Sequence, residues 1–224
     1  MTAPFDTLQG LLDDRWTCRQ FLPEPVPQPD IERLLALSQR TPSWCNTQPW
    51  QVVVTSGDAT EAFRKGLAEH LLAHPQEPDI AFPSAYAGDY QARRRACGFQ
   101  LYDSLAISKD DGDARLKQML RNFELFDAPH VAIVTTETDL GPYGAVDCGL
   151  WVSTFLLGAQ ALGLAAAPQA ALAGYAPFVR EHFGIPDSRQ VVVGISFGYA
   201  DLDHPVNAFR TSRAPLDDVV SWVS

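Results

Sequence analysis

The sequence is poor in positive charge. It has 17 Lys and Arg residues against 27 Asp and Glu, which gives a net charge of −10 over 224 residues. Because phosphate backbones attract basic surfaces, we expect no nucleic-acid partner. The same acidity disfavours a polybasic surface that would hold the protein on a membrane.

Targeting and membrane signals are also missing. The first ten residues lack the basic and apolar regions of a secretory signal. The longest uncharged stretch, residues 148–179, is long enough to cross a bilayer, but its glycines and polar residues favour a buried helix followed by a loop. The four cysteines are widely scattered, as expected for reduced thiols. We therefore expect a cytoplasmic protein without a membrane partner.

Several motifs of well-known sites are absent. There is no G-x-G-x-x-G, no G-x-x-x-x-G-K and no Cys/His spacing typical of a metal site, and His70 and His74 lack the Glu of H-E-x-x-H. The stretch Gly194–Gly198 (G-I-S-F-G) fits the nucleophile elbow of hydrolases, but a turn-rich segment follows where that motif needs a helix. A serine hydrolase that uses Ser196 is therefore a minor alternative.

The composition is typical of a globular domain, with 46% hydrophobic and 20% charged residues. Hydrophobic periodicity predicts one α+β domain over residues 1–224, with a buried first strand and a central last strand. The expected helices are 5–14, 29–40, 59–73, 89–107, 113–122 and 144–162, and the expected strands are 50–55, 131–136 and 191–197. Residues 74–88 are expected to form a loop, and the irregular tail turns weakly helical from Leu216.

Two short arginine pairs lie at opposite ends of the chain. If residues 15–19 are extended, Arg15, Thr17 and Arg19 point to one side. Arg210 and Arg213 form the second pair. Guanidinium groups match phosphate oxygens in charge and geometry, so folding that joins the pairs would create a pocket for a phosphate monoester. The alternative is a solvated surface cluster.

Two further segments have the composition of ligand contacts. In residues 41–50 (T-P-S-W-C-N-T-Q-P-W), an extended path would aim the amides of Asn46 and Gln48 the same way, unless they bond to the local backbone. Cys45 in this loop is expected to be a buried, inert thiol. The small residues of 162–171 would let a flat ring approach, or would allow tight packing of a helix on a loop.

Seven segments, taken in order, resemble motifs of the nitroreductase family of FMN-dependent oxidoreductases. They are R-W-T-C-R-Q-F (15–21), T-P-S-W-C-N-T-Q-P-W (41–50), R-N-F-E-L-F-D-A-P (121–129), G-L-A-A-A-P-Q-A (163–170), F-G-I-P (183–186), V-V-V-G-I-S-F-G-Y-A-D (191–201) and N-A-F-R-T-S-R (207–213). The later segments look closest to members that reduce nitroaromatic compounds such as nitrobenzoate. In two departures, Trp16 stands where a second Arg is common and Thr17 replaces Ser.

The resemblance implies a three-layer α+β fold, with a mostly antiparallel sheet flanked by helices, in an intertwined homodimer with FMN at the interface. Arg15, Thr17, Arg19 and Arg213 would hold phosphate or ribityl groups, with Arg210 beside them. Asn46 and Gln48 would address the ring, and the backbone N–H of Ala170 would approach its reactive nitrogen. The full set of implied cofactor-binding residues is Arg15, Trp16, Thr17, Arg19, Ser43, Asn46, Gln48, Pro168, Gln169, Ala170, Gly198, Arg210 and Arg213.

The resemblance also implies a ping-pong reaction in which NADH or NADPH reduces the flavin and leaves. An electron-poor small-molecule acceptor, such as a nitroaromatic or a quinone, then enters the same site. No catalytic side chain is expected, because the flavin carries the chemistry. Residues 74–112 would form a lid or insert, with Tyr86, Tyr90 and Phe99 as candidate contacts. Reductive dehalogenation, flavin fragmentation and FMN binding without turnover are the alternatives.

Overall fold

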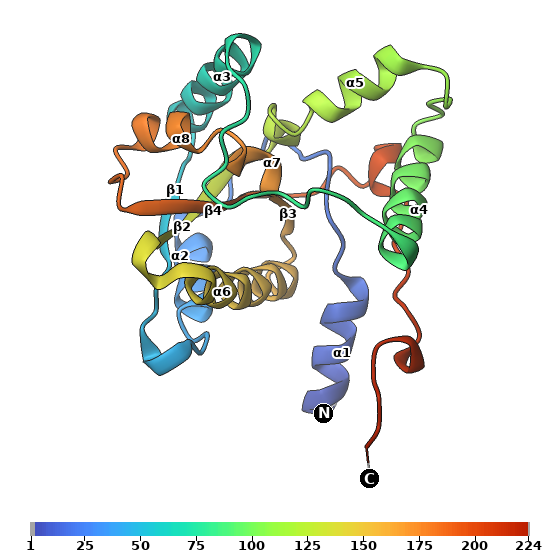
Figure 1. Ribbon diagram of the computed structural model, residues 1–224, viewed down its shortest axis with the longest axis horizontal. Coiled ribbons are helices and arrows are strands. Elements are labelled where there is room, and N and C mark those ends of the chain that lie inside the picture. Colours follow the sequence, from blue (N-terminus) through green and yellow to red (C-terminus); the bar gives the residue numbers. More distant parts are fainter. Residues whose placement is uncertain (1–2, 224) are drawn as a thin grey trace.

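A computed structural model describes residues 3–223, and it places one four-stranded sheet between two layers of helices (Figure 1). The α-helices are α1 (Pro4–Asp14), α2 (Gln28–Ser38), α3 (Asp58–Ala73), α4 (Gly88–Ser104), α5 (Gly112–Leu120), α6 (Gly141–Ala161), α7 (Ala170–Ala173) and α8 (Ala176–Phe183). The strands are β1 (Gln51–Val54), β2 (His130–Glu137), β3 (Ala165–Gln169) and β4 (Arg189–Gly198). Single 3₁₀ turns lie at Trp44–Asn46, Leu125–Asp127, Thr138–Leu140, Pro205–Asn207 and Leu216–Asp218.

The sheet has the order β1-β2-β4-β3, and each neighbouring pair is antiparallel. Successive residues of a strand point to opposite faces of the sheet. Strand β2 therefore contributes side chains to two hydrophobic clusters, one on each face. Val134 belongs to the cluster that contains Trp151 of α6. Ile133 belongs to the cluster that contains Phe63 of α3. Helices α2 and α6 therefore cover one face and α3 and α8 the other, which confirms the expected three-layer α+β fold (Figure 1).

The predicted helices and strands are all present within a few residues, but one burial prediction is wrong. Strand β4 is central, as expected. Strand β1 was expected to be buried, but it lies at the edge of the sheet, and its residues are half-buried or exposed. Its valines reach both cores, yet no described strand covers its outer side. A run of valines indicates a strand without revealing its position in the sheet.

Strand β3 and helices α7 and α8 are elements that the sequence did not indicate. Residues Ala165–Ala167 have low intrinsic preference for strands, and β3 forms because it pairs along β4, from Ala165 opposite Gly198 to Gln169 opposite Gly194. Helix α8 has Pro in its first turn and ends at Gly184 in a left-handed conformation, with φ of 63°. These boundary residues are typical of helices. The helix was not predicted because its eight residues are too few to show a clear hydrophobic periodicity.

The first arginine segment is fixed between β3 and the C-terminal tail. Thr17 forms a parallel bridge with Ala166, and the Cys18 N–H donates to Ala166 O at 3.2 Å. On the tail side, Asn207 Oδ1 accepts from the Arg19 N–H at 2.8 Å. Hydrogen bonds from the backbone N–H groups of Cys18 and Arg19 thus hold residues that are far apart in the sequence next to each other.

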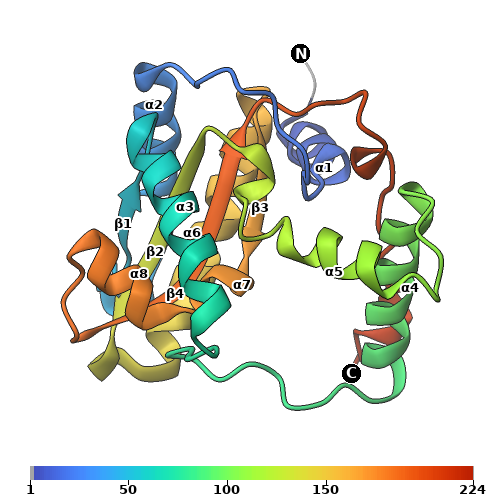
Figure 2. The ribbon, with the colours of Figure 1, turned by 90° about the horizontal axis from the view of Figure 1, so that it is seen from above.

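Residues 74–112 leave the body of the protein and return to it. Near their start, the Glu77 N–H donates to Gly174 O at 2.7 Å, and Asp79 pairs with Arg180 while accepting from the Val191 N–H. Beyond these anchors, α4 and α5 extend away from the sheet, and α4 lies beside the tail (Figure 2). None of the helices that the structure describes is long and apolar enough to span a membrane.

Candidate functional site

The two arginine pairs do meet in the folded chain. A pocket of about 200 Å³ lies where the end of α1 and the following segment approach the C-terminal tail. Its lining residues are Leu12, Asp13, Arg15, Trp16, Thr17, Arg210, Thr211 and Arg213. We call this the cationic pocket. It brings together five of the residues that the sequence suggested for cofactor binding.

The charges of the cationic pocket are not neutralised by carboxylates in ion pairs. Arg213 donates to the oxygens of Thr211 and Ser212, and Arg210 donates to backbone carbonyls while lying 4.2 Å from the Trp16 ring. No ion pair within residues 3–223 includes these two arginines or Arg15. Asp13 lines the pocket but is exposed.

Burial, and then the charge of Arg213, lower the pKa of Arg15. An anion placed between the two guanidinium groups would relieve both effects, and the Thr17 hydroxyl lies beside it as a further donor. The Trp16 Nε1 atom is buried without a hydrogen-bond partner. The residues present therefore fit a phosphate group.

Arg19 is not among the residues that line the cationic pocket. Its guanidinium donates to Thr17 O at 3.2 Å and lies 5.3 Å from the centre of the Phe209 ring. Arg19 thus connects the first arginine segment to the tail, next to the pocket. Arg15 and Thr17 therefore line one pocket, whereas the side chain of Arg19 lies outside its lining.

The segment Pro168–Ala170 comprises the end of β3 and the first residue of α7, and its central side chain is fixed in the core. The Gln169 side chain is 4% exposed. Its Nε2 donates to Asn122 O at 2.7 Å, and its Oε1 accepts from Ser196 Oγ at 2.5 Å. Ala170 is exposed and Pro168 is half-buried. The backbone at Ala170 is therefore presented to solvent from a rigid base.

Ser196 and Gly198 have packing roles in this structure. Ser196 is 0% exposed, lies within β4 and donates to Gln169, so it does not form the exposed turn that a nucleophilic serine needs. A Cβ on Gly198 would lie 2.7 Å from Pro129 Cδ. The small size of Gly198 thus serves packing against Pro129 at the end of β4, and its place beside a cofactor stays a prediction.

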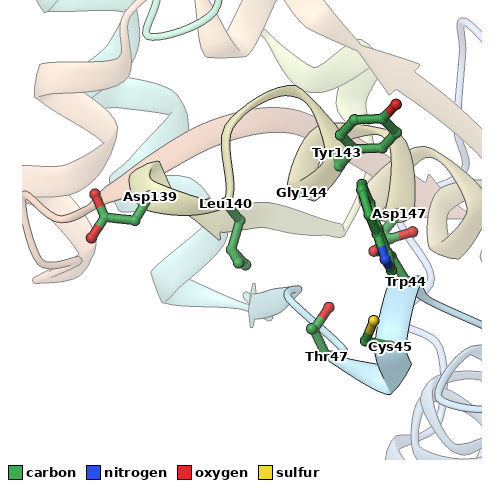
Figure 3. A pocket seen from close by; sticks show the side chains of 8 residues that line it. All are labelled: Trp44, Cys45, Thr47, Asp139, Leu140, Tyr143, Gly144 and Asp147. Atoms are coloured by element: carbon green, nitrogen blue, oxygen red, sulfur yellow. Dashed lines mark hydrogen bonds between the residues drawn. The ribbon is translucent and has the colours of Figure 1, made fainter.

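A second region surrounds the turn between α2 and β1 and is shown in Figure 3. The Trp44 N–H donates to Asp147 Oδ2 at 3.0 Å, and the Trp44 and Tyr143 rings meet edge to face with centroids 4.3 Å apart. The turn and the start of α6 border a cavity of about 300 Å³. Its lining residues are Trp44, Cys45, Thr47, Asp139, Leu140, Tyr143, Gly144 and Asp147. We call this the aromatic pocket.

Two expectations for this turn are wrong, and both have the same cause. Cys45, Asn46 and Gln48 have φ angles of 50°, 57° and 48°, so the chain coils here instead of running extended. Asn46 and Gln48 are therefore not aligned by a strand-like path. Cys45 is exposed rather than buried, because the turn holds it at the surface.

Both the backbone N–H and the side-chain amide of Gln48 form hydrogen bonds within the chain. Its backbone N–H donates to Ser43 Oγ at 2.9 Å, and its side-chain Nε2 donates to Asn46 O at 3.2 Å. Its Oε1 accepts from Gln39 Nε2 at 3.1 Å. This is the local bonding that the sequence left open as the alternative, and it makes the turn rigid.

The cationic and aromatic pockets share no lining residue within one chain. The turn between α2 and β1, which is light blue, lies on one side of α6, and α1 lies on the other (Figures 1 and 2). Folding of a single chain thus brings Arg15, Thr17, Arg210 and Arg213 together and pairs Thr17 with Ala166 of β3. It does not join them to Ser43, Asn46 and Gln48.

Some residues of these regions carried no motif. Asp147 is 6% exposed and caps the Trp44 N–H, and a lone carboxylate within an apolar helix was the available signal. Asn122 and Ser196 form the hydrogen bonds that fix Gln169. No sequence motif indicated them, because Asn122 is 47 residues and Ser196 is 27 residues from Gln169. The candidate lid contacts Tyr86, Tyr90 and Phe99 are all exposed.

Comparison with known proteins identifies the family. The model of the nitroreductase family matches residues 12–199. The nitroreductase NfnB of Mycolicibacterium smegmatis is 37% identical over 219 residues, 96% of this chain and 92% of the relative. A 4-nitrobenzoate reductase of Pseudomonas putida is 31% identical over 211 residues, 93% of this chain and 92% of the relative. The structure of the FMN-dependent nitroreductase NfnB from Mycobacterium smegmatis in complex with NADPH superposes with a TM-score of 0.93 at 32% identity, covering 98% of this chain and 99% of that one. The chain therefore belongs to the nitroreductase family.

Proposed function

We propose that the protein is an FMN-dependent oxidoreductase that uses NAD(P)H to reduce an electron-poor acceptor such as a nitroaromatic compound or a quinone. The observation that carries the proposal is the cationic pocket, in which arginines from both ends of the chain meet without ion-pair partners. Its relatives support the same chemistry, because NfnB is an FMN-dependent nitroreductase solved with NADPH and another relative reduces 4-nitrobenzoate.

When bound, FMN would supply the hydride chemistry, and the chain would bind it, orient it and exclude water. Arg15, Thr17 and Arg213 would hold its phosphate, with Arg210 and Trp16 forming the wall of the pocket. Arg19 would support this wall through Phe209. The parallel bridge between Thr17 and Ala166 puts β3 beside the pocket, so Pro168, Gln169 and Ala170 would follow the ring.

A homodimer would complete the site. Tyr143, Val146 and Leu150 form an exposed apolar stripe on α6, with helical spacing. Phe5, Leu8 and Leu12 form a similar stripe on α1. Exposed apolar patches of this kind mark interfaces. We propose that pairing of two chains covers these stripes and brings the turn with Ser43, Asn46 and Gln48 to the cationic pocket of the partner.

The reaction would follow a ping-pong order, because NAD(P)H and the acceptor would use one open ligand face in turn. The chain would act by positioning: the buried bonds from Ser196 and Asn122 to Gln169 fix the peptide that leads to Ala170. Residues 74–112 would act as the lid that shields this face, since α4 lies beside the tail. The cytoplasm is the compartment that would supply NAD(P)H.

The direct test is spectroscopic. Purified protein should be yellow, should bleach with NADPH or NADH under anaerobic conditions, and should regain its colour with a nitroaromatic compound. Colour that bleaches but is not restored by any acceptor would indicate an FMN-binding protein without this turnover. Protein that never binds FMN would overturn the proposal.

A further inference from the structure

A groove of about 680 Å³ lies between α4 and the C-terminal tail, next to the cationic pocket. Arg93 of α4 and Arg213 of the tail both line it. Arg213 also lines the cationic pocket, so the groove opens beside the proposed phosphate site. Gln100 and Ser212 add uncharged hydrogen-bonding groups to its wall.

The positive charge of this groove is weakly neutralised. The nearest carboxylate to Arg93 is that of Asp89 at 4.0 Å, and its side chain is 84% exposed, so the pair is weak. Arg213 donates to neutral oxygens of the tail. Among the described residues that line the groove, Asp218 is the only carboxylate. Two arginines thus line one cavity in a protein whose net charge is −10.

Arg93 is the first of three consecutive arginines on α4. Because they are neighbours on a helix, their side chains project in different directions. A helix advances 100° per residue, so neighbours cannot share one face. Arg94 lies 5.1 Å from the centre of the Tyr86 ring, and neither Arg94 nor Arg95 lines the groove. The helix therefore directs only the first of the three arginines into this cavity and supplies matched controls beside it.

We propose, on the basis of the function proposed above, that Arg93 and Arg213 bind the anionic group of a substrate in this groove. Two substrates offer this chemistry: the 2′-phosphate of NADPH, which NADH lacks, and the carboxylate of a nitrobenzoate, which nitrobenzene lacks. Guanidinium groups bind both anions with paired hydrogen bonds. The groove thus determines which of two otherwise similar substrates the enzyme prefers.

The test measures equilibrium binding to the FMN-loaded protein, using NADP⁺ against NAD⁺ and 4-nitrobenzoate against nitrobenzene. In Arg93→Gln, the dissociation constant of the anionic member of one pair should rise about threefold to tenfold, while that of its neutral counterpart stays the same. The affected pair identifies the source of the anion. Arg95→Gln, with the same loss of charge on the same helix, should change neither, and Asp218→Asn should tighten binding of the same anion.

Three results would overturn the inference. Equal effects of Arg93→Gln and Arg95→Gln would indicate a general change in charge without a site. A change in the mass of the assembly in Arg93→Gln would make the groove an interface between subunits. Loss of FMN from Arg93→Gln would make it part of the flavin site. In each case the wild-type protein keeps its flavin and turnover, whereas failure of the proposed function would appear as wild-type protein that binds no FMN.

Discussion

The cationic pocket and the aromatic pocket differ in what they lack. The cationic pocket has converging arginines without ion-pair partners among the described residues, and the Trp16 ring lies in its wall. The aromatic pocket has the Trp44 and Tyr143 rings and a rigid turn, but its charged residues are Asp139 and Asp147. Each resembles half of a site for a phosphorylated aromatic cofactor. One folded chain thus assembles the two regions apart from each other, and the proposed homodimer is the arrangement that would bring them together.

The largest effect is expected from removing the charge of the cationic pocket. In Arg15→Ala combined with Arg213→Ala, the affinity for FMN should fall roughly 100-fold or more, because each charge-assisted hydrogen bond contributes about 1.5–3 kcal/mol. Flavin fluorescence titration of the apoprotein measures this loss. The control is Arg33→Ala, which removes an exposed arginine paired with Asp30 on α2. Unchanged affinity in the double variant would refute the phosphate assignment.

The next largest effect is expected from disrupting the proposed dimer, which would separate the cationic pocket of one chain from the turn with Asn46 and Gln48 of its partner. Val146→Glu places a charge on the exposed stripe of α6, so it should convert dimers to monomers and weaken FMN binding in parallel. Light scattering coupled to size-exclusion chromatography gives the mass, and absorbance gives the flavin content. Leu72→Glu on α3, where the side chain is 84% exposed, is the control. A monomer that keeps full FMN affinity would show that one chain suffices.

A smaller effect tests the support beneath the segment Pro168–Ala170. Ser196→Ala removes the hydroxyl that donates to Gln169 Oε1, and the unpaired buried oxygen should reduce the free energy of unfolding by about 1–3 kcal/mol. It should also shift the reduction potential of bound FMN, since the peptide before Ala170 loses its anchor. Ser38→Ala removes a comparable buried bond, to Leu34 O, far from the pocket. Equal potentials in both variants would limit Ser196 to a structural role.

The smallest effect is a difference in thiol reactivity. Burial raises the pKa of Cys18 to about 11 and that of Cys148 to about 12, so both should resist a thiol reagent at pH 8. Cys45 is exposed in a single chain and should react. If the partner covers the turn, the dimer should react more slowly at Cys45 than the Val146→Glu monomer. Mass spectrometry of labelled peptides measures the rates, and equal rates would place Cys45 outside the interface.

The sequence predicted the meeting of distant arginines better than the local path of the turn. Helical and strand periodicity and the in-order motifs were enough for the α+β fold and for joining Arg15 to Arg213. Strand β3 was missed because its alanines depend on pairing with β4. The turn at Cys45 was misjudged because neither Cys45 nor Gln48 is a residue type that favours left-handed backbone, and Asn46 is only a weak signal of it.

The most direct measurement uses a mixed dimer. One chain carries Arg15→Ala and Arg213→Ala, and the other carries Asn46→Ala and Gln48→Ala, with different affinity tags so that only mixed dimers are purified. If each flavin site combines the cationic pocket of one chain with the turn of its partner, the mixed dimer contains one intact site and should bind one FMN per dimer, while each variant homodimer binds little. A mixed dimer that binds no more FMN than the two homodimers would show that both halves come from the same chain.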